Sequence, residues 1–142
     1  MIRAEPPWLG YWRDRLAFKS AAVAAKMIGR SEGERVLREA ILLTIADDDL
    51  GQAGKLFFAT RMLTRRRGTV PTPVVKELAD LFGIRWDDGL APVPDVVDTV
   101  IQSGRAAPFA VADLITAISA VRPDAEAMAL GLAEVVLAQK LK

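Results

Sequence analysis

The sequence predicts an all-α protein, arranged as a single-domain bundle or orthogonal array of about seven helices over residues 1–142. Residues that start and stop helices recur along the chain, whereas the alternation of apolar and polar residues typical of strands is absent. Alanine, the strongest helix former, is the commonest residue with 23 copies. A length of 142 residues lies near the commonest domain size, so one domain is expected.

The first predicted helix runs from Trp8 to Ile28, between a Pro-Pro pair and Gly29. Large apolar side chains recur along it at helical spacing and form one stripe. We expect that stripe to face the core. Its members are Trp8, Trp12, Leu16, Val23 and Met27.

Ser31 and Glu34 have the spacing of a capping box, which predicts a second helix through about Ile45. Asp47-Asp48-Asp49 is typical of a helix start, and a third helix is expected from Leu50 to about Arg67. Gly68 follows this helix and cations fill its last turn, as the helix dipole favours.

Four more helices follow from proline and glycine positions. A loop from Ile84 to Pro94, anchored by Trp86, is expected after the first of them. The predicted helices are Thr72 to Phe82 with Thr72 as N-cap, Asp95 to Gly104, Pro108 to Arg122, and Pro123 almost to Lys142.

The chain contains no Cys and no His. Zinc, copper and iron–sulfur sites of the ordinary kinds and catalysis by imidazole or thiolate are therefore excluded. We expect no catalytic residue, no metal site and no cofactor, and hence not an enzyme. No segment has the length and composition of a signal peptide or membrane span, so a soluble, cytoplasmic protein without membrane contact is expected.

Charge is unevenly distributed, although the net charge is only +1. Residues 1–86 carry 15 Lys and Arg against 10 acids, whereas residues 87–142 carry 4 against 8. This polarity is compatible with a solvated surface of no special role. That interpretation is preferred; the alternative is that the polarity steers a charged partner or favours head-to-tail association.

An aromatic and basic cluster occupies the start of the first predicted helix. Trp, Tyr and Arg are the residue types that dominate binding hot spots. The cluster is therefore either a wide core-facing surface or a surface for a partner or self-association. Its candidate partner-binding residues are Trp8, Leu9, Tyr11, Trp12 and Arg15.

Two features bear on nucleic acids. The densest basic patch comprises Lys55, Arg61, Arg65, Arg66 and Arg67, which would bind phosphates or simply solvate a helix end. Glu77 to Ile84 resembles the first helix and turn of a helix-turn-helix. The following residues include Asp87, Asp88, Gly89 and Pro92, which disfavour a recognition helix, so an ordinary short helix is preferred.

Several segments together resemble a family of bacterial proteins described only as a domain of unknown function. At the start of the chain they are residues 3–8, 12–16, 19–22 and 29–30, and near its end residues 123–126, 129–130 and 137–141. Members of that family extend beyond both ends of this chain, so the resemblance implies a short member or a fragment. It implies no activity and no functional residue.

These observations favour a non-enzymatic helical protein–protein interaction module that binds a protein partner or forms a homo-oligomer. Two alternatives stay open: a nucleic-acid-associated regulator that uses the basic patch, and a pocket between helices that binds a small molecule. Nucleic acid is the less favoured partner because the net charge is close to zero.

Overall fold

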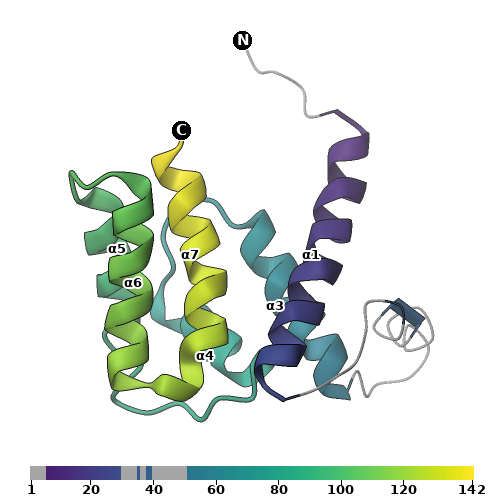
Figure 1. Ribbon diagram of the computed structural model, residues 1–142, viewed down its shortest axis with the longest axis horizontal. Helices are drawn as coiled ribbons and strands as arrows, with labels where there is room; N and C mark the ends of the chain where they lie inside the picture. The colour runs from purple at the N-terminus through teal and green to yellow at the C-terminus, as the bar shows by residue number, and fades with distance from the viewer. Residues whose placement is uncertain (1–5, 30–34, 36–37, 40–50) are drawn as a thin grey trace. The chain divides into compact units, whose positions relative to one another are not determined.

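The computed structural model describes residues 6–29, 35, 38–39 and 51–142. This part of the chain contains six α-helices, one short 3₁₀ helix and no strand (Figure 1). The all-α prediction is confirmed, and the predicted number of about seven helices is slightly too high. The predicted second helix, its capping box at Ser31 and Glu34, and the cap at Asp47-Asp48-Asp49 lie largely or wholly outside the described residues.

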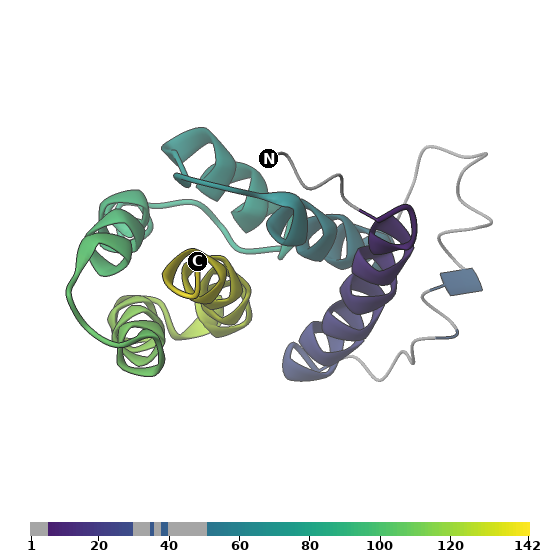
Figure 2. The ribbon, with the colours of Figure 1, turned by 90° about the horizontal axis from the view of Figure 1, so that it is seen from above.

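The chain divides into two compact units, Met1–Arg65 and Arg66–Lys142. The first contains helices α1 (Trp8–Met27) and α3 (Gly51–Arg65). Figure 2 shows these two helices side by side, and their contact is the most extensive between any two of the described helices. Both begin and end close to their predicted bounds, and Gly29 follows α1 with a left-handed backbone (φ +80°) that favours glycine.

The face of α1 that packs on α3 is made of alanine, not of the predicted large side chains. Four alanines of α1 are buried, and they recur at steps of one, three and four residues. Alanine has almost no side chain beyond the backbone, so it lets two helices approach closely. The buried alanines are Ala17, Ala21, Ala24 and Ala25.

Two contacts supplement this alanine face. The ring of Phe18 stacks on Phe57 of α3 with centroids 4.3 Å apart. The buried hydroxyl of Thr60 lies 3.0 Å from the carbonyl oxygen of Ala17 and 2.9 Å from that of Phe57. Its single proton can therefore be donated to α1 or to its own helix, and the buried hydroxyl is satisfied either way.

The prediction that the stripe of large apolar residues on α1 faces the core is wrong. All five of these side chains are exposed. The physical reason is that the alanines occupy the opposite side of the helix and take the contact with α3. In a helix of 3.6 residues per turn, burying that side turns the stripe away. The exposed members are Trp8, Trp12, Leu16, Val23 and Met27.

The second unit contains α4 (Thr72–Leu81), α5 (Val93–Gln102), α6 (Ala107–Val121), the 3₁₀ helix η1 (Pro123–Ala125) and α7 (Glu126–Lys140). Pro71, not Thr72, occupies the N-cap of α4, and its carbonyl accepts from the backbone N–H groups of Val74 and Val75. α5 begins two residues before the predicted Asp95. Figure 2 shows α5, α6 and α7 nearly end-on and packed around one another, and η1 makes the turn from α6 into α7.

α7 forms the centre of this unit. Seven of its fifteen residues are buried and spread over most of its circumference, as expected for a helix with neighbours on several sides. At its end, the ammonium of Lys140 donates to the carbonyl oxygen of Ser103 at 2.6 Å, which ties α7 to the residues after α5. The buried residues of α7 are Ala127, Met128, Ala129, Leu132, Ala133, Val135 and Val136.

The predicted loop is present between α4 and α5, and Arg122 holds it. The guanidinium donates to both carboxylate oxygens of Asp124, at 2.9 and 2.7 Å, and to the carbonyl oxygen of Arg85 at 3.0 Å. It also lies 2.7 Å from Asp87, which accepts from the backbone N–H of Gly89. We call this group of contacts the Arg122 clamp. The hydrogen bond with Arg122 lowers the pKa of Asp124, and the same bond raises the pKa of Arg122.

Trp86 also lies in this loop, and the ammonium of Lys76 is placed 5.2 Å from the centroid of its ring. This cation–π contact and the half-buried position of the indole agree with the predicted anchoring role. Among the described helices, none combines the length and the apolar character needed to cross a membrane.

Candidate interaction surface

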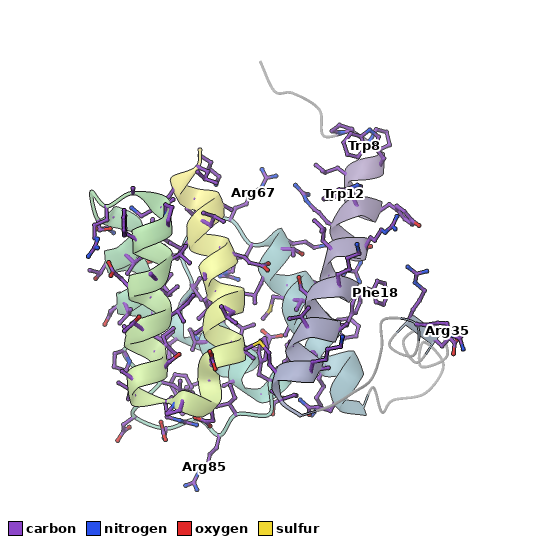
Figure 3. All side chains as sticks on the ribbon, in the orientation of Figure 1. Trp8, Trp12, Phe18, Arg35, Arg67 and Arg85 are labelled. Atoms are coloured by element: carbon purple, nitrogen blue, oxygen red, sulfur yellow. The ribbon has the colours of Figure 1, made fainter. Side chains whose placement is uncertain are left out.

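The side of α1 opposite the alanine face carries a continuous set of exposed aromatic and basic side chains. Trp8 is 62% exposed, Tyr11 71% and Trp12 54%. Figure 3 labels both indoles near the amino-terminal end of α1. We call this surface the outer face of α1 and define it as Trp8, Tyr11, Trp12, Arg15, Leu16 and Lys19.

Local sequence sets where the outer face begins. Pro7 precedes α1 with a helical backbone (φ −56°, ψ −29°), and the backbone N–H of Leu9 donates to the carbonyl of Pro6 at 3.0 Å. Proline suits this position because its missing N–H would have no partner in the first turn of a helix. The helix therefore starts directly at Trp8, and Trp8 and Trp12 lie one turn apart on the same side.

A hollow of about 260 Å³ lies on this face, and the described residues lining it are Trp12, Arg15, Leu16 and Lys19. Pockets for drug-sized ligands span roughly 300–1,000 Å³ and are mostly apolar, so this hollow is small for such a ligand. It combines one aromatic ring and one aliphatic side chain with two cations.

The outer face is electrostatically positive. Within the described residues, neither Arg15 nor Lys19 forms an ion pair. The one acid of α1, Asp14, lies beside α3, where its Oδ1 is 3.1 Å from Nε of Arg61 and 3.3 Å from Nη2 of Arg65. The carboxylate of Asp14 therefore pairs with arginines of α3, whereas the cations Arg15 and Lys19 lie on the outer face.

The structure brings part of the predicted basic patch together and pairs it with acid. Arg65 donates a hydrogen bond to Asp14, whereas the N–H of Arg61 is close to the same oxygen without being aligned for a hydrogen bond. Arg66 donates to the carbonyl of Thr69 at 3.0 Å. Arg61 and Arg65 belong to the first compact unit, and Arg66 and Arg67 to the second. Lys55 is half-buried on α3.

These contacts reduce what Arg61 and Arg65 offer to a phosphate group. Binding phosphate would require each guanidinium to leave Asp14, or would place the phosphate near a carboxylate of the same sign. A second hollow, of about 220 Å³, is lined by Phe58, Arg61, Met62 and Arg65 on α3 and shares the same ion pairs.

The segment resembling a helix-turn-helix does not continue into a recognition helix. α4 ends at Leu81, residues 84–92 form the loop held by the Arg122 clamp, and α5 starts only at Val93. Asp87 and Gly89 are engaged in the clamp, so the preference for an ordinary short helix is confirmed.

Of the predicted partner-binding residues, the structure places Trp8, Tyr11, Trp12 and Arg15 on the outer face. Leu9 is half-buried at its margin. Sequence reasoning missed Leu16 as a surface residue and did not select Lys19. Their spacing of four residues from Trp12 and Arg15 would have found them, once the buried side of the helix was known to be alanine.

Comparison with known proteins gives a family without an assigned activity. No curated protein and no solved structure shows a significant match to this chain. One family model matches residues 1–142, the entire length of the chain. The chain therefore belongs to the family described as "Protein of unknown function (DUF1403)".

Proposed function

We propose that this chain is a non-enzymatic helical interaction module that binds a protein partner through the outer face of α1. The observation that carries the proposal is the exposure of Trp8, Tyr11 and Trp12 on one side of a helix whose other side is packed. Large aromatic side chains contribute strongly to binding when a partner removes them from water. Nothing in the packing of α1 on α3 requires them.

The polar groups beside the aromatics support the same function. Arg15 and Lys19 rim the hollow next to Trp12 and provide charge at the edge of an apolar centre. Interfaces commonly have this composition, in which charges set orientation and association rate while buried aromatics supply affinity. We place the module in the cytoplasm, because a chain without Cys suits a reducing compartment.

Replacing Trp12 with glutamate tests this function. The tagged full chain and its Trp12→Glu variant would each be used to capture proteins from lysate of the source cell, with and without nuclease. We expect the variant to retain on the order of 30-fold less of the specific partner, since a hot-spot aromatic contributes about 2 kcal/mol or more. Quantitative mass spectrometry of the captured material measures this ratio.

Phe109→Glu is the matched control, because Phe109 is an equally exposed aromatic (61%) in the second unit. This control should capture the partner as well as the unchanged chain does. A cooperative thermal transition in Trp12→Glu would show that the fold survives, and Trp8→Glu supplies a second variant if it does not. Capture that is unaffected by both Trp variants, or that disappears on nuclease treatment, would rule out the proposed function.

A further inference from the structure

A second exposed stripe lies on α7 and continues past its end. Glu126, Leu130, Glu134, Leu137 and Leu141 follow one another at steps of four, four, three and four residues, which places them on one side of a helix. Leu130 and Leu137 are each 38% exposed and Leu141 is 71% exposed, and both glutamates are exposed as well. The seven buried residues of α7 lie on its other sides, within the second unit. This acidic and apolar stripe is the outer face of α7.

Glu134 lies in the middle of this stripe without a cation. No ion pair involving Glu134 is present among the described residues, and the apolar surroundings of this carboxyl raise its pKa above the ordinary value. A carboxylate that has lost part of its water, and is flanked by Leu130 and Leu137, gains more from an incoming cation than a fully hydrated one.

The outer faces of α1 and α7 have matching spacing. From Trp8 the steps to Trp12, Arg15 and Lys19, and on to the exposed Val23 one turn beyond the defined face, are four, three, four and four residues. Read backward from Leu141, the steps along α7 are also four, three, four and four. Steps of three and four are those by which two helices pack along a common seam, and equal steps in opposite directions fit an antiparallel pair.

Three of the five paired positions are complementary in this register. Trp8 falls opposite Leu141, Trp12 opposite Leu137 and Arg15 opposite Glu134. At the next position along the pair, Lys19 lies opposite Leu130 and one helical turn from both Glu126 and Glu134. At the last position, Val23 lies opposite Glu126.

A parallel register with the same steps would place Trp12 against Glu134 and both cations against leucine. Burying a carboxylate against an indole without a counterion is unfavourable, so the antiparallel register is favoured over this parallel one.

We propose that the outer face of α1 in one copy of this chain binds the outer face of α7 in a second copy, as an antiparallel helix pair. This inference rests on the proposed function of the α1 face and specifies its partner. Each chain carries both halves of the contact, and the basic excess of residues 1–86 and the acidic excess of residues 87–142 attract each other between copies. The charge complementarity and the matched register favour a second copy over an unrelated acidic protein.

Charge reversal and recombination test this pairing. Sedimentation equilibrium would be measured on the full chain, on Arg15→Glu with Lys19→Glu, and on Glu126→Lys with Glu134→Lys. We expect the unchanged chain to self-associate and each variant to self-associate with at least roughly tenfold lower affinity. Like charges then lie opposite each other at positions 15 and 134, and position 19 lies one turn from like charges at positions 126 and 134. An equimolar mixture of the two variants should associate again, since the reversed charges are complementary.

Arg85→Glu with Lys142→Glu is the matched control, because it reverses two cations that lie outside both outer faces. This control should associate like the unchanged chain. A chain that stays monomeric at all concentrations, variants that associate normally, or dissociated variants that the mixture does not restore would each overturn the pairing. If the chain is monomeric but Trp12→Glu captures less of a protein partner than the unchanged chain does, the proposed function is supported and self-association is rejected. Failure of both experiments rejects both.

Discussion

The carboxyl group of Asp124 makes the Arg122 clamp sensitive to pH. The clamp joins residues on either side of α5 and α6, and Arg122 keeps only 14% of its side chain exposed. Because the hydrogen bond from Arg122 lowers the pKa of Asp124 in the folded chain, the ionised carboxyl stabilises the fold. This contribution to the stability of the fold is complete at pH values above the ordinary pKa of Asp. It is lost as the pH falls through the lower pKa that Asp124 has in the folded chain.

Asp124→Asn should therefore lower Tm by a few degrees near pH 7, because the amide keeps the shape but not the charge. The difference from the unchanged chain should begin to shrink below about pH 4, the ordinary pKa of Asp, and disappear only as the pH falls below the lower pKa that Asp124 has in the folded chain. Thermal unfolding followed by circular dichroism between pH 3 and 7 measures it. Asp80→Asn, at an exposed acid without a clamp contact, is the control. An equal difference at every pH would contradict this account.

The sequence did not reveal the clamp at the level of single residues. Arg122 lies 37 positions after Arg85 and 35 positions after Asp87, and only the path of the chain through α5 and α6 brings them together. The sequence also does not show why position 89 is a glycine. A Cβ there would lie 3.1 Å from the Asp87 carboxylate and 3.2 Å from Val121.

At the scale of elements, the helix ends were predictable and the buried side of α1 was not. Proline and glycine act through the local backbone, so they indicate where α4, α5 and α6 begin and end to within a few residues. The side that a helix buries depends on its neighbour instead. Ranking residues by size selected Trp8 and Trp12 for the core, whereas α3 packs on alanines that allow a closer approach.

This packing makes α1 intolerant of larger side chains on its alanine face. Ala21→Leu should lower the free energy of unfolding by about 1–3 kcal/mol, because the added carbon atoms have no space between two closely packed helices. Ala22→Leu, on the neighbouring and partly exposed side, should cost less. Urea unfolding of both variants compares them. Equal stability of Ala21→Leu and the unchanged chain would mean that the α1–α3 contact is loosely packed.

At the scale of the whole molecule, composition predicted the fold class and only half of the proposed interface. The all-α class follows from the high alanine content and from the frequent residues that start and stop helices. Both act locally, so they indicate helices whatever the tertiary arrangement. The aromatic and basic cluster of α1 stands out in sequence because three of the nine aromatic residues of the chain gather within five positions, next to arginines. The Leu and Glu residues of α7 are common in any helix, so their stripe becomes visible only when burial shows which of them remain exposed.

The positions of the three tryptophans give each unit its own optical signal. Trp8 and Trp12 are exposed on α1, and Trp86 is half-buried in the second unit beside Lys76. An indole in water emits at longer wavelength and is more accessible to a soluble quencher than one against protein. Covering the outer face of α1 should therefore shift the emission of Trp8 and Trp12 to shorter wavelength and protect them from acrylamide. Trp86→Phe leaves only these two indoles and would isolate that signal, so association can be followed by fluorescence without an attached dye.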